Sequence, residues 1–177
     1  MKKLTSIKDL DVIIRNALIF HSQTDGAFVR NALSEYGADL DKSDGDSIFE
    51  SLLPSDTCIL FEIQSADSDY DASMTEGNDL TYFKSFAARI IIYGDNSGDV
   101  GVTLAARLRS EYSRSELYEQ GIYISDISNP IHVDEYKNGV IWHRCDFDIE
   151  FSVQLTIPQV AENETFEILN ETIIKEA

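Results

Sequence analysis

The carboxylates of the segment after residue 38 have a spacing that could bind calcium. Asp39, Asp41, Ser43 and Glu50 occupy the first, third, fifth and twelfth ligand positions of a calcium-binding loop. Such a loop needs glycine at its sixth position for a sharp turn, and this chain has Asp44 there. We therefore expect a solvated acidic turn in this segment and no metal site.

Three glycines could instead cradle a phosphate. Gly94, Gly98 and Gly101 lie between an expected strand and an expected helix. Their spacing matches neither G-x-G-x-x-G nor the P-loop, and Asp95 and Asp99 would repel a phosphate. We expect a glycine turn that leads into a capped helix.

The histidines and cysteines show no catalytic or metal-binding spacing. His21, His132 and His143 form no His-Glu-x-x-His motif, and Cys58 and Cys145 form no Cys-x-x-Cys pair. His143 and Cys145 share one face of an expected strand, and that face is otherwise apolar, so we expect both to be packed core residues. Both cysteines are expected to be buried thiols. The sequence thus predicts no catalytic residue, no cofactor and no enzymatic activity.

The charge of the chain limits its partners. It has 32 acidic and 14 basic residues, a net charge of −18 and a pI near 4.3. Such a surface repels phosphates, which argues against nucleic-acid binding as a source of affinity but allows DNA to pass nearby. Asp146, Asp148 and Glu150 alternate on one strand face, where we expect a solvent-facing or interface-facing stripe rather than an acid/base pair.

The composition predicts one soluble domain over residues 1–177. The chain is 43% hydrophobic and 10% aromatic, which suffices for one core. No apolar run approaches the roughly 20 residues that cross a bilayer, and the segment after Met1 is charged and amphipathic. We expect synthesis in a cytoplasm and no membrane partner.

Periodicity places the elements of the first half. Apolar residues recur at helical spacing from Thr5 to Gln23, with Ser6 as N-cap, and a weaker helical pattern covers Ala27–Tyr36. Thr57–Ser65 and Leu80–Tyr93 have strand composition, and the end of the second strand, Ile90–Tyr93, is expected to be buried on both faces. Residues 66–79 are expected to form a long loop at the tip of the hairpin between these strands, with Tyr70 and Met74 as its large apolar residues.

The second half contains the strongest pattern. A helix with Ser97 or Asp99 as its cap is expected to reach Tyr112, followed by a strand over Leu117–Ile127. Lys137-Asn138-Gly139 predicts a hairpin turn, after which apolar and polar residues alternate from Val140 to Ile157. Residues 158–177 are expected to form a short closing strand or an arm. Together these elements predict an α+β fold, a mostly antiparallel sheet with helices packed on one face.

The second half also resembles a known family. The features are Tyr93-Gly94-Asp95 at a strand end, the helix Leu104–Arg109, the strand start Gly121-Ile122, and the segment Trp142–Asp148 that opens the last long strand. Over residues 80–157 the sequence is similar to bacteriophage neck-terminator and tail-terminator proteins of the tail-completion type. The resemblance implies a virion protein that forms a ring, of six copies, and joins the finished tail tube to the head connector while DNA passes without specific binding.

The expected interface residues are Tyr70, Met74, Asp146, Asp148 and Glu150. Tyr70 and Met74 would anchor the loop in a neighbouring subunit or the tube, and the acidic stripe would face the lumen, solvent or a basic partner. Two alternatives stay open. One is another phage structural role, as a tail-tube or head-completion subunit, and the other is a small ligand-binding or enzymatic domain.

Overall fold

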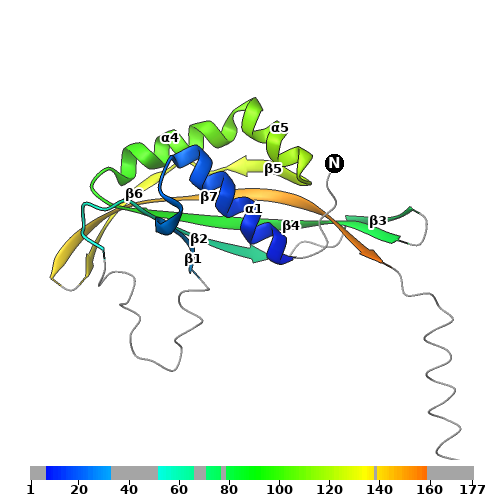
Figure 1. The fold of residues 1–177 in the computed structure, drawn as a ribbon, viewed down its shortest axis with the longest axis horizontal. Coiled ribbons are helices and arrows are strands. Elements are labelled where there is room, and N and C mark those ends of the chain that lie inside the picture. The colour runs from blue at the N-terminus through cyan, green and yellow to red at the C-terminus, as the bar shows by residue number, and fades with distance from the viewer. Residues whose placement is uncertain (1–6, 33–51, 66–70, 77–78, 138, 159–177) are drawn as a thin grey trace, which may run out of the picture.

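The computed structural model describes residues 7–32, 52–65, 71–76, 79–137 and 139–158 (Figure 1). The expected acidic turn at 39–47, Tyr70 and the expected arm after Pro158 lie outside these residues. The elements follow in this order: α1 (Ile7–Ser22), the 3-10 turn η1 (Gly26–Phe28), β1 (Val29–Asn31), β2 (Cys58–Ser65), β3 (Asp71–Glu76), β4 (Asp79–Tyr93), α4 (Ser97–Arg109), α5 (Glu111–Glu119), β5 (Ile122–Ile127), β6 (Ile131–Lys137) and β7 (Val140–Pro158).

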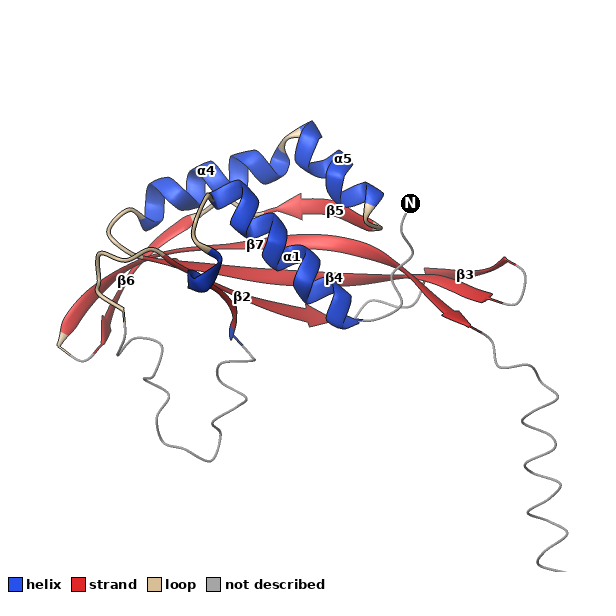
Figure 2. Ribbon diagram, viewed as in Figure 1, coloured by secondary structure: helices blue, strands red, loops and turns tan. Residues whose placement is uncertain are grey.

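The strands form one seven-stranded sheet with helices on one face (Figure 2). Its order is β1-β2-β4-β7-β5, while β3 pairs with β4 and β6 pairs with β7. Only β1 and β2 are parallel among the described pairs. β4 and β7 pair along their length, from Asp79 opposite Pro158 to Tyr93 opposite Arg144. The expected α+β fold is confirmed.

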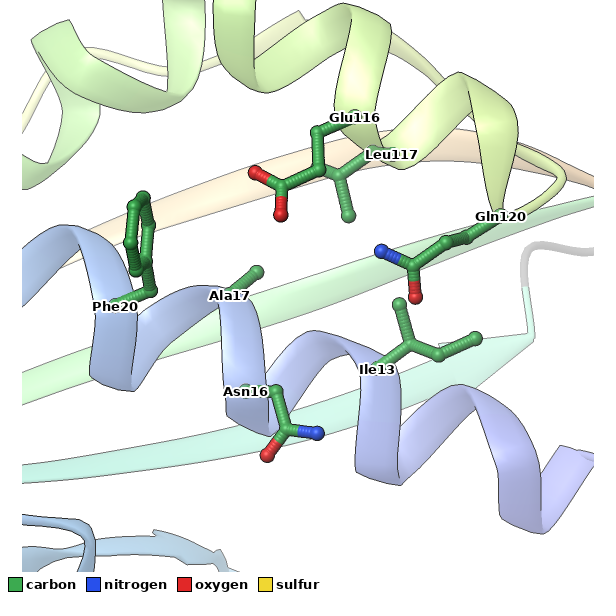
Figure 3. A pocket seen from close by; sticks show the side chains of 7 residues that line it. All are labelled: Ile13, Asn16, Ala17, Phe20, Glu116, Leu117 and Gln120. Atoms are coloured by element: carbon green, nitrogen blue, oxygen red, sulfur yellow. The ribbon is translucent and has the colours of Figure 1, made fainter.

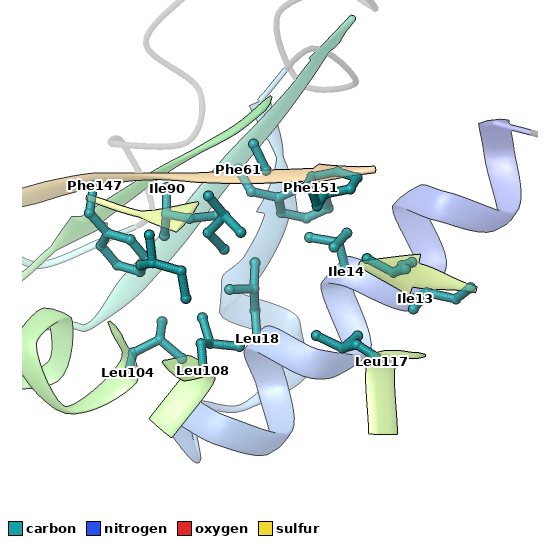
Figure 4. Packing of buried hydrophobic residues seen from close by; sticks show 14 of the residues in the cluster. Ile13, Ile14, Leu18, Phe61, Ile90, Leu104, Leu108, Leu117, Phe147 and Phe151 are labelled. Carbon is teal, nitrogen blue, oxygen red and sulfur yellow. The ribbon is translucent and has the colours of Figure 1, made fainter. Parts of the chain in front are cut away.

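The core lies between the helices and the sheet (Figure 4). Alternation along β7 turns one set of side chains toward the helices, because successive residues of a strand point to opposite faces. This set is fully or almost fully buried: Cys145, Phe147, Ile149, Phe151, Val153 and Leu155. The apolar stripes of the helices cover it with Leu10, Ile14, Leu18, Leu104, Leu108 and Leu117. The alternation and the first helix were thus correctly predicted.

A second apolar cluster lies on the opposite face of the sheet. It contains Ala32, Cys58, Leu60, Tyr93 and Trp142, with Leu52 and Ile91 packed against them. Ile90 and Ile92 belong to the core beneath the helices, whereas Ile91 and Tyr93 belong to this second cluster. The expected burial of Ile90–Tyr93 on both faces is confirmed for Ile90, Ile92 and Tyr93, whereas Ile91 is only partly buried.

The weaker helix expected over Ala27–Tyr36 is wrong at its start. Val29–Asn31 form β1, which pairs in parallel with Ile59, Leu60 and Phe61 of β2. Val29 is fully buried, and its carbonyl oxygen accepts a hydrogen bond of 2.9 Å from Arg15 Nε. Pairing and burial supplied by the sheet outweigh a weak local preference for helix.

Two predicted boundaries between residues 109 and 122 are wrong. The predicted helix extended to Tyr112, beyond the end of α4, and the predicted strand began at Leu117, before the start of β5. α4 ends at Arg109, and Ser110 starts α5 because its hydroxyl accepts a hydrogen bond from Ser113 N. Leu117 is therefore helical and β5 begins at Ile122. The start of α4 also differs, since its N-cap is Asn96, whose side chain makes no capping hydrogen bond.

The loop expected over residues 66–79 contains a strand. β3 pairs with the first part of β4, from Asp71 opposite Phe83 to Glu76 opposite Asp79. β2 pairs with the second part of the same strand. The expected antiparallel pairing of β2 with β4 is therefore correct. The polar residues of β3 also form a strand, because backbone pairing to β4 does not require apolar side chains. Among the described residues, no helix is long and apolar enough to span a membrane.

Candidate interaction surfaces

The acidic stripe of β7 points away from the helices. Asp146, Asp148 and Glu150 alternate with the buried residues of the strand, and Asp148 and Glu150 are exposed. Arg89 lies opposite Asp148 and Ala87 lies opposite Glu150 on β4. The structure therefore places all three carboxylates on one sheet face, as the sequence predicted, and their role as an interface stays a prediction.

Asp146 differs from the other two because arginines hold it. Its Oδ2 lies 2.8 Å from Arg144 Nη2 and 3.3 Å from Arg89 Nη2, and only 13% of its side chain is exposed. Arg144 also donates to Glu135 Oε2 at 3.0 Å, and the Tyr93 hydroxyl donates to the same oxygen at 2.9 Å. Burial, and then the hydrogen bond to Glu135, raises the pKa of Tyr93, so this hydroxyl keeps its proton. The network fixes Asp146 in the sheet, whereas Asp148 and Glu150 are exposed.

A polar hollow of about 270 Å³ lies where α4 begins beside the β6–β7 hairpin. His143 Nδ1 and Asp134 Oδ1 are 2.8 Å apart there, and half or more of each side chain is exposed. The expectation that His143 is a core residue is wrong, because its side chain is 53% exposed and lies in this hollow among polar residues at the start of α4 and in β6. Among the described residues no three potential ligands converge as a metal site would require.

Both cysteines are buried thiols, as expected. Cys145 lies beneath α4, where it contacts the position of Gly101. Burial, followed by the negative charge of Asp146, raises the pKa of Cys145. A thiol in this state is a poor nucleophile, because the thiolate is the reactive form.

His21 joins α1, α4 and α5. Its Nε2 lies 2.8 Å from Ser113 Oγ of α5, and its carbonyl oxygen accepts a 2.5 Å hydrogen bond from Arg107 Nη1 of α4. Burial is the main cause that lowers the pKa of His21; Glu116 opposes this shift and Arg107 adds to it. His21 is thus a structural residue that is best accommodated in its neutral form.

A groove of about 290 Å³ separates α1 from α5, and its lining combines four apolar side chains with those of Asn16, Glu116 and Gln120 (Figure 3). Ile13 and Ala17 face α5, Leu117 faces α1, and the ring of Phe20 stands at one end with 59% of its surface exposed. Glu116 is the charged member among the described residues that line the groove. The periodicity of residues 5–23 predicts a single buried stripe on α1, and no sequence pattern indicated α5, so the groove was not predicted.

The β6–β7 hairpin carries exposed apolar side chains. Tyr136 and Ile141 are direct cross-strand partners, exposed at 74% and 56%, and Ile131 and Val140 are also exposed. The expected turn is confirmed, since Lys137 pairs with Val140 and Gly139 has a φ of 82°. In the sequence, Tyr136 and Ile141 flank this turn. That pattern indicates a hairpin, but it does not show whether another part of the protein covers these two side chains.

The expected loop anchors are only partly described. Met74 lies in β3 opposite Thr81, and Tyr70 lies outside the described residues. Their proposed contacts with a neighbouring subunit or the tail tube remain predictions.

Comparison with known proteins identifies the family. The family model described as phage neck terminator protein matches residues 52–176, which include β2 to β7. A search of curated protein sequences found no match. Proteins of this family have a structural role in the virion, where they interact with other neck and tail proteins. The match covers more than half of the chain, so this chain belongs to the phage neck terminator protein family.

Proposed function

We propose that this protein forms a closed ring of six copies at the phage neck, where it terminates the tail tube and joins it to the head connector. Membership of the neck terminator family supports a structural role at this position. A ring that closes by rotation uses two different surfaces on each subunit, because each copy contacts the next in the same head-to-tail manner.

The observation that carries this proposal is the placement of exposed apolar side chains on two separate parts of the subunit. One part is the β6–β7 hairpin with Tyr136 and Ile141, and the other is the side of the helical layer with Phe20. Single exposed apolar residues are common, but a paired cluster beside a polar surface is typical of an interface. A lone subunit would leave both parts in water.

The acidic stripe is proposed as a third surface, directed at a neck partner or at the lumen. Asp148 and Glu150 are exposed and alternate with the buried residues of β7, so they lie on the sheet face that points away from the helices. Facing the lumen, they would repel the DNA backbone and allow passage without adhesion.

The segment 66–79, with Tyr70 and Met74, is proposed to contact the next subunit or the tube. Deleting Ser68–Gly77 should then impair assembly or tail-length control, and normal assembly of that variant would refute this contact.

The solution mass tests the ring. Purified protein is measured by light scattering during size-exclusion chromatography over a range of concentrations and is imaged by negative-stain electron microscopy. A six-fold mass and closed rings support the proposal. Open polymers would indicate a tube subunit, and a monomer at every concentration would contradict ring formation.

A further inference from the structure

We propose that the groove between α1 and α5 binds a basic amphipathic segment of another protein. The segment places a bulky apolar side chain at the base of the groove and a lysine or arginine beside the carboxylates at its rim (Figure 3). This inference goes beyond the ring, because it assigns the groove to a different protein. A neighbouring copy in the ring can still contact Phe20, which only bounds the groove at one end.

The base of the groove is apolar and belongs to the core. Ile13 and Leu117 are almost fully buried, and Ala17, one turn after Ile13 on α1, contributes only a methyl group. The volume of about 290 Å³ is roughly ten times the share of one water molecule in the liquid, which is ample for one bulky side chain. An apolar side chain that enters this space leaves water, and that transfer favours binding.

Polar side chains form the rim of the groove. Glu116 and Gln120 extend from α5 toward α1, and Asn16 lies on α1 (Figure 3). Among the described residues, these three side chains have no hydrogen-bond or ion-pair partner. The two amides can donate to and accept from the backbone of a segment laid along the groove. An apolar base inside a polar rim is the arrangement that protein interfaces use.

The charge around the groove is negative. Glu119 follows Glu116 by three residues on α5, and Asp9 precedes Ile13 by four on α1, so each lies on the groove side of its helix. All three carboxylates are exposed. Arg114 lies two residues before Glu116 and therefore faces another side of α5. Among the described side chains on these two helix faces, no lysine or arginine offsets the carboxylates, so the rim attracts a cationic group.

Charge complementarity selects a different protein as the occupant. A second copy has a net charge of −18 and is repelled by the rim. The arginines for which the structure describes hydrogen bonds donate to oxygens of their own copy: Arg15, Arg89, Arg107, Arg109 and Arg144. Nucleic acid and anionic lipid carry the same sign of charge as the rim. A basic segment of another protein matches both the rim and the apolar base.

A photo-cross-linker at the rim identifies the occupant. Asn16 is exposed and is replaced by p-benzoylphenylalanine, and Val102, exposed on α4 and outside the groove, is replaced in the same way as a baseline. Phage-infected cells that supply each variant are irradiated, and mass spectrometry identifies the cross-linked peptide. The expected peptide belongs to another neck or tail protein, forms only with the Asn16 variant, and has net positive charge around the cross-linked residue. A cross-link to a further copy, to an acidic segment, or none above the Val102 baseline would overturn the proposal.

Two further changes, each combined with the cross-linker at position 16, test the rim and the base separately. Glu116→Lys with Glu119→Lys reverses the charge of the rim, and Ala17→Leu extends a side chain into the base without changing any charge. Each should reduce the yield of the cross-link at least about tenfold, because like charges or a filled base oppose binding. Circular dichroism with thermal unfolding checks that the variants fold. An unchanged yield in either folded variant would contradict the proposed contact.

The matched control is Asp95→Lys with Asp126→Lys. Both residues are exposed and neither lines the groove, so the net charge changes equally at a different place. Its cross-link yield should stay within about twofold of the parent. Purified Glu116→Lys with Glu119→Lys should keep the solution mass of the wild type, and a smaller mass would show that copies meet in the groove and overturn this inference. A wild-type protein that stays monomeric, with the cross-link intact, would refute the ring and leave this site standing.

Discussion

Replacing Gly101 with alanine is expected to reveal how closely α4 approaches the sheet. Gly101 is buried in α4, and a Cβ placed there would lie 2.5 Å from Cys145 Sγ, 3.3 Å from Cys145 Cβ and 3.7 Å from Ile92 Cδ1. The first distance is far inside van der Waals contact. Ile92 and Cys145 are direct partners on β4 and β7, so neither neighbour can move without disturbing the centre of the sheet.

Two opposing effects determine how much Gly101→Ala changes the free energy of unfolding. Overpacking a dense core costs about 1–3 kcal/mol. Alanine in place of glycine in a helix interior returns about 1 kcal/mol. The free energy of unfolding should therefore fall by about 0–2 kcal/mol. In a Cys145→Ala background the sulfur is gone, so the same change should become neutral or stabilising by up to about 1 kcal/mol. The predicted coupling between the two positions is about 1–3 kcal/mol.

Urea unfolding measures this coupling in a double-mutant cycle. The single tryptophan, Trp142, is buried on the opposite sheet face, and its fluorescence together with circular dichroism reports unfolding. The control cycle pairs Gly101→Ala with Cys58→Ala, because Cys58 is an equally buried thiol in the second apolar cluster. Its effects should add within about 0.5 kcal/mol. Equal coupling in both cycles, or none in the Cys145 cycle, would refute the proposed close packing of α4 on β7.

Three further predictions concern other parts of the molecule. Burial lowers the pKa of His21, so below the usual pKa near 6.5 the unfolded chain binds a proton that the folded chain resists, and the free energy of unfolding falls as pH falls. The variant His21→Gln should reduce this dependence on pH in urea titrations between pH 7 and pH 5. An unchanged pH dependence would contradict the role given to His21. Gly94 has a φ of 124°, and an added Cβ would lie 2.8 Å from Asp56 O. Gly94→Ala should therefore lower the free energy of unfolding, measured by urea unfolding, by about 1–3 kcal/mol. An unchanged free energy of unfolding would show that alanine is not strained at this position. Asp148→Lys with Glu150→Lys should change the free energy of unfolding by no more than about 0.5 kcal/mol, since both side chains are exposed, yet reduce tail completion in an in vitro assembly assay; normal completion would argue against the stripe as a functional surface.

The candidate surfaces show where sequence patterns stop being informative. The alternation of β7 placed Asp148 and Glu150 together on one face, because period-two geometry is a property of any strand. The same alternation put His143 with Cys145, and only the extent of the helical layer shows that one is exposed and the other buried. Burial depends on which element covers a face, and that element is distant in the sequence.

The local sequence by itself determined α1, the long strands β4 and β7 and the turn before Gly139, since each is specified by periodicity or turn chemistry within its own residues. Tertiary structure decided the rest. Val29 becomes a strand residue because β2 lies beside it, and the groove exists because α5 packs near α1. Such features arise from contacts between distant segments, whose pairing a one-dimensional pattern does not encode.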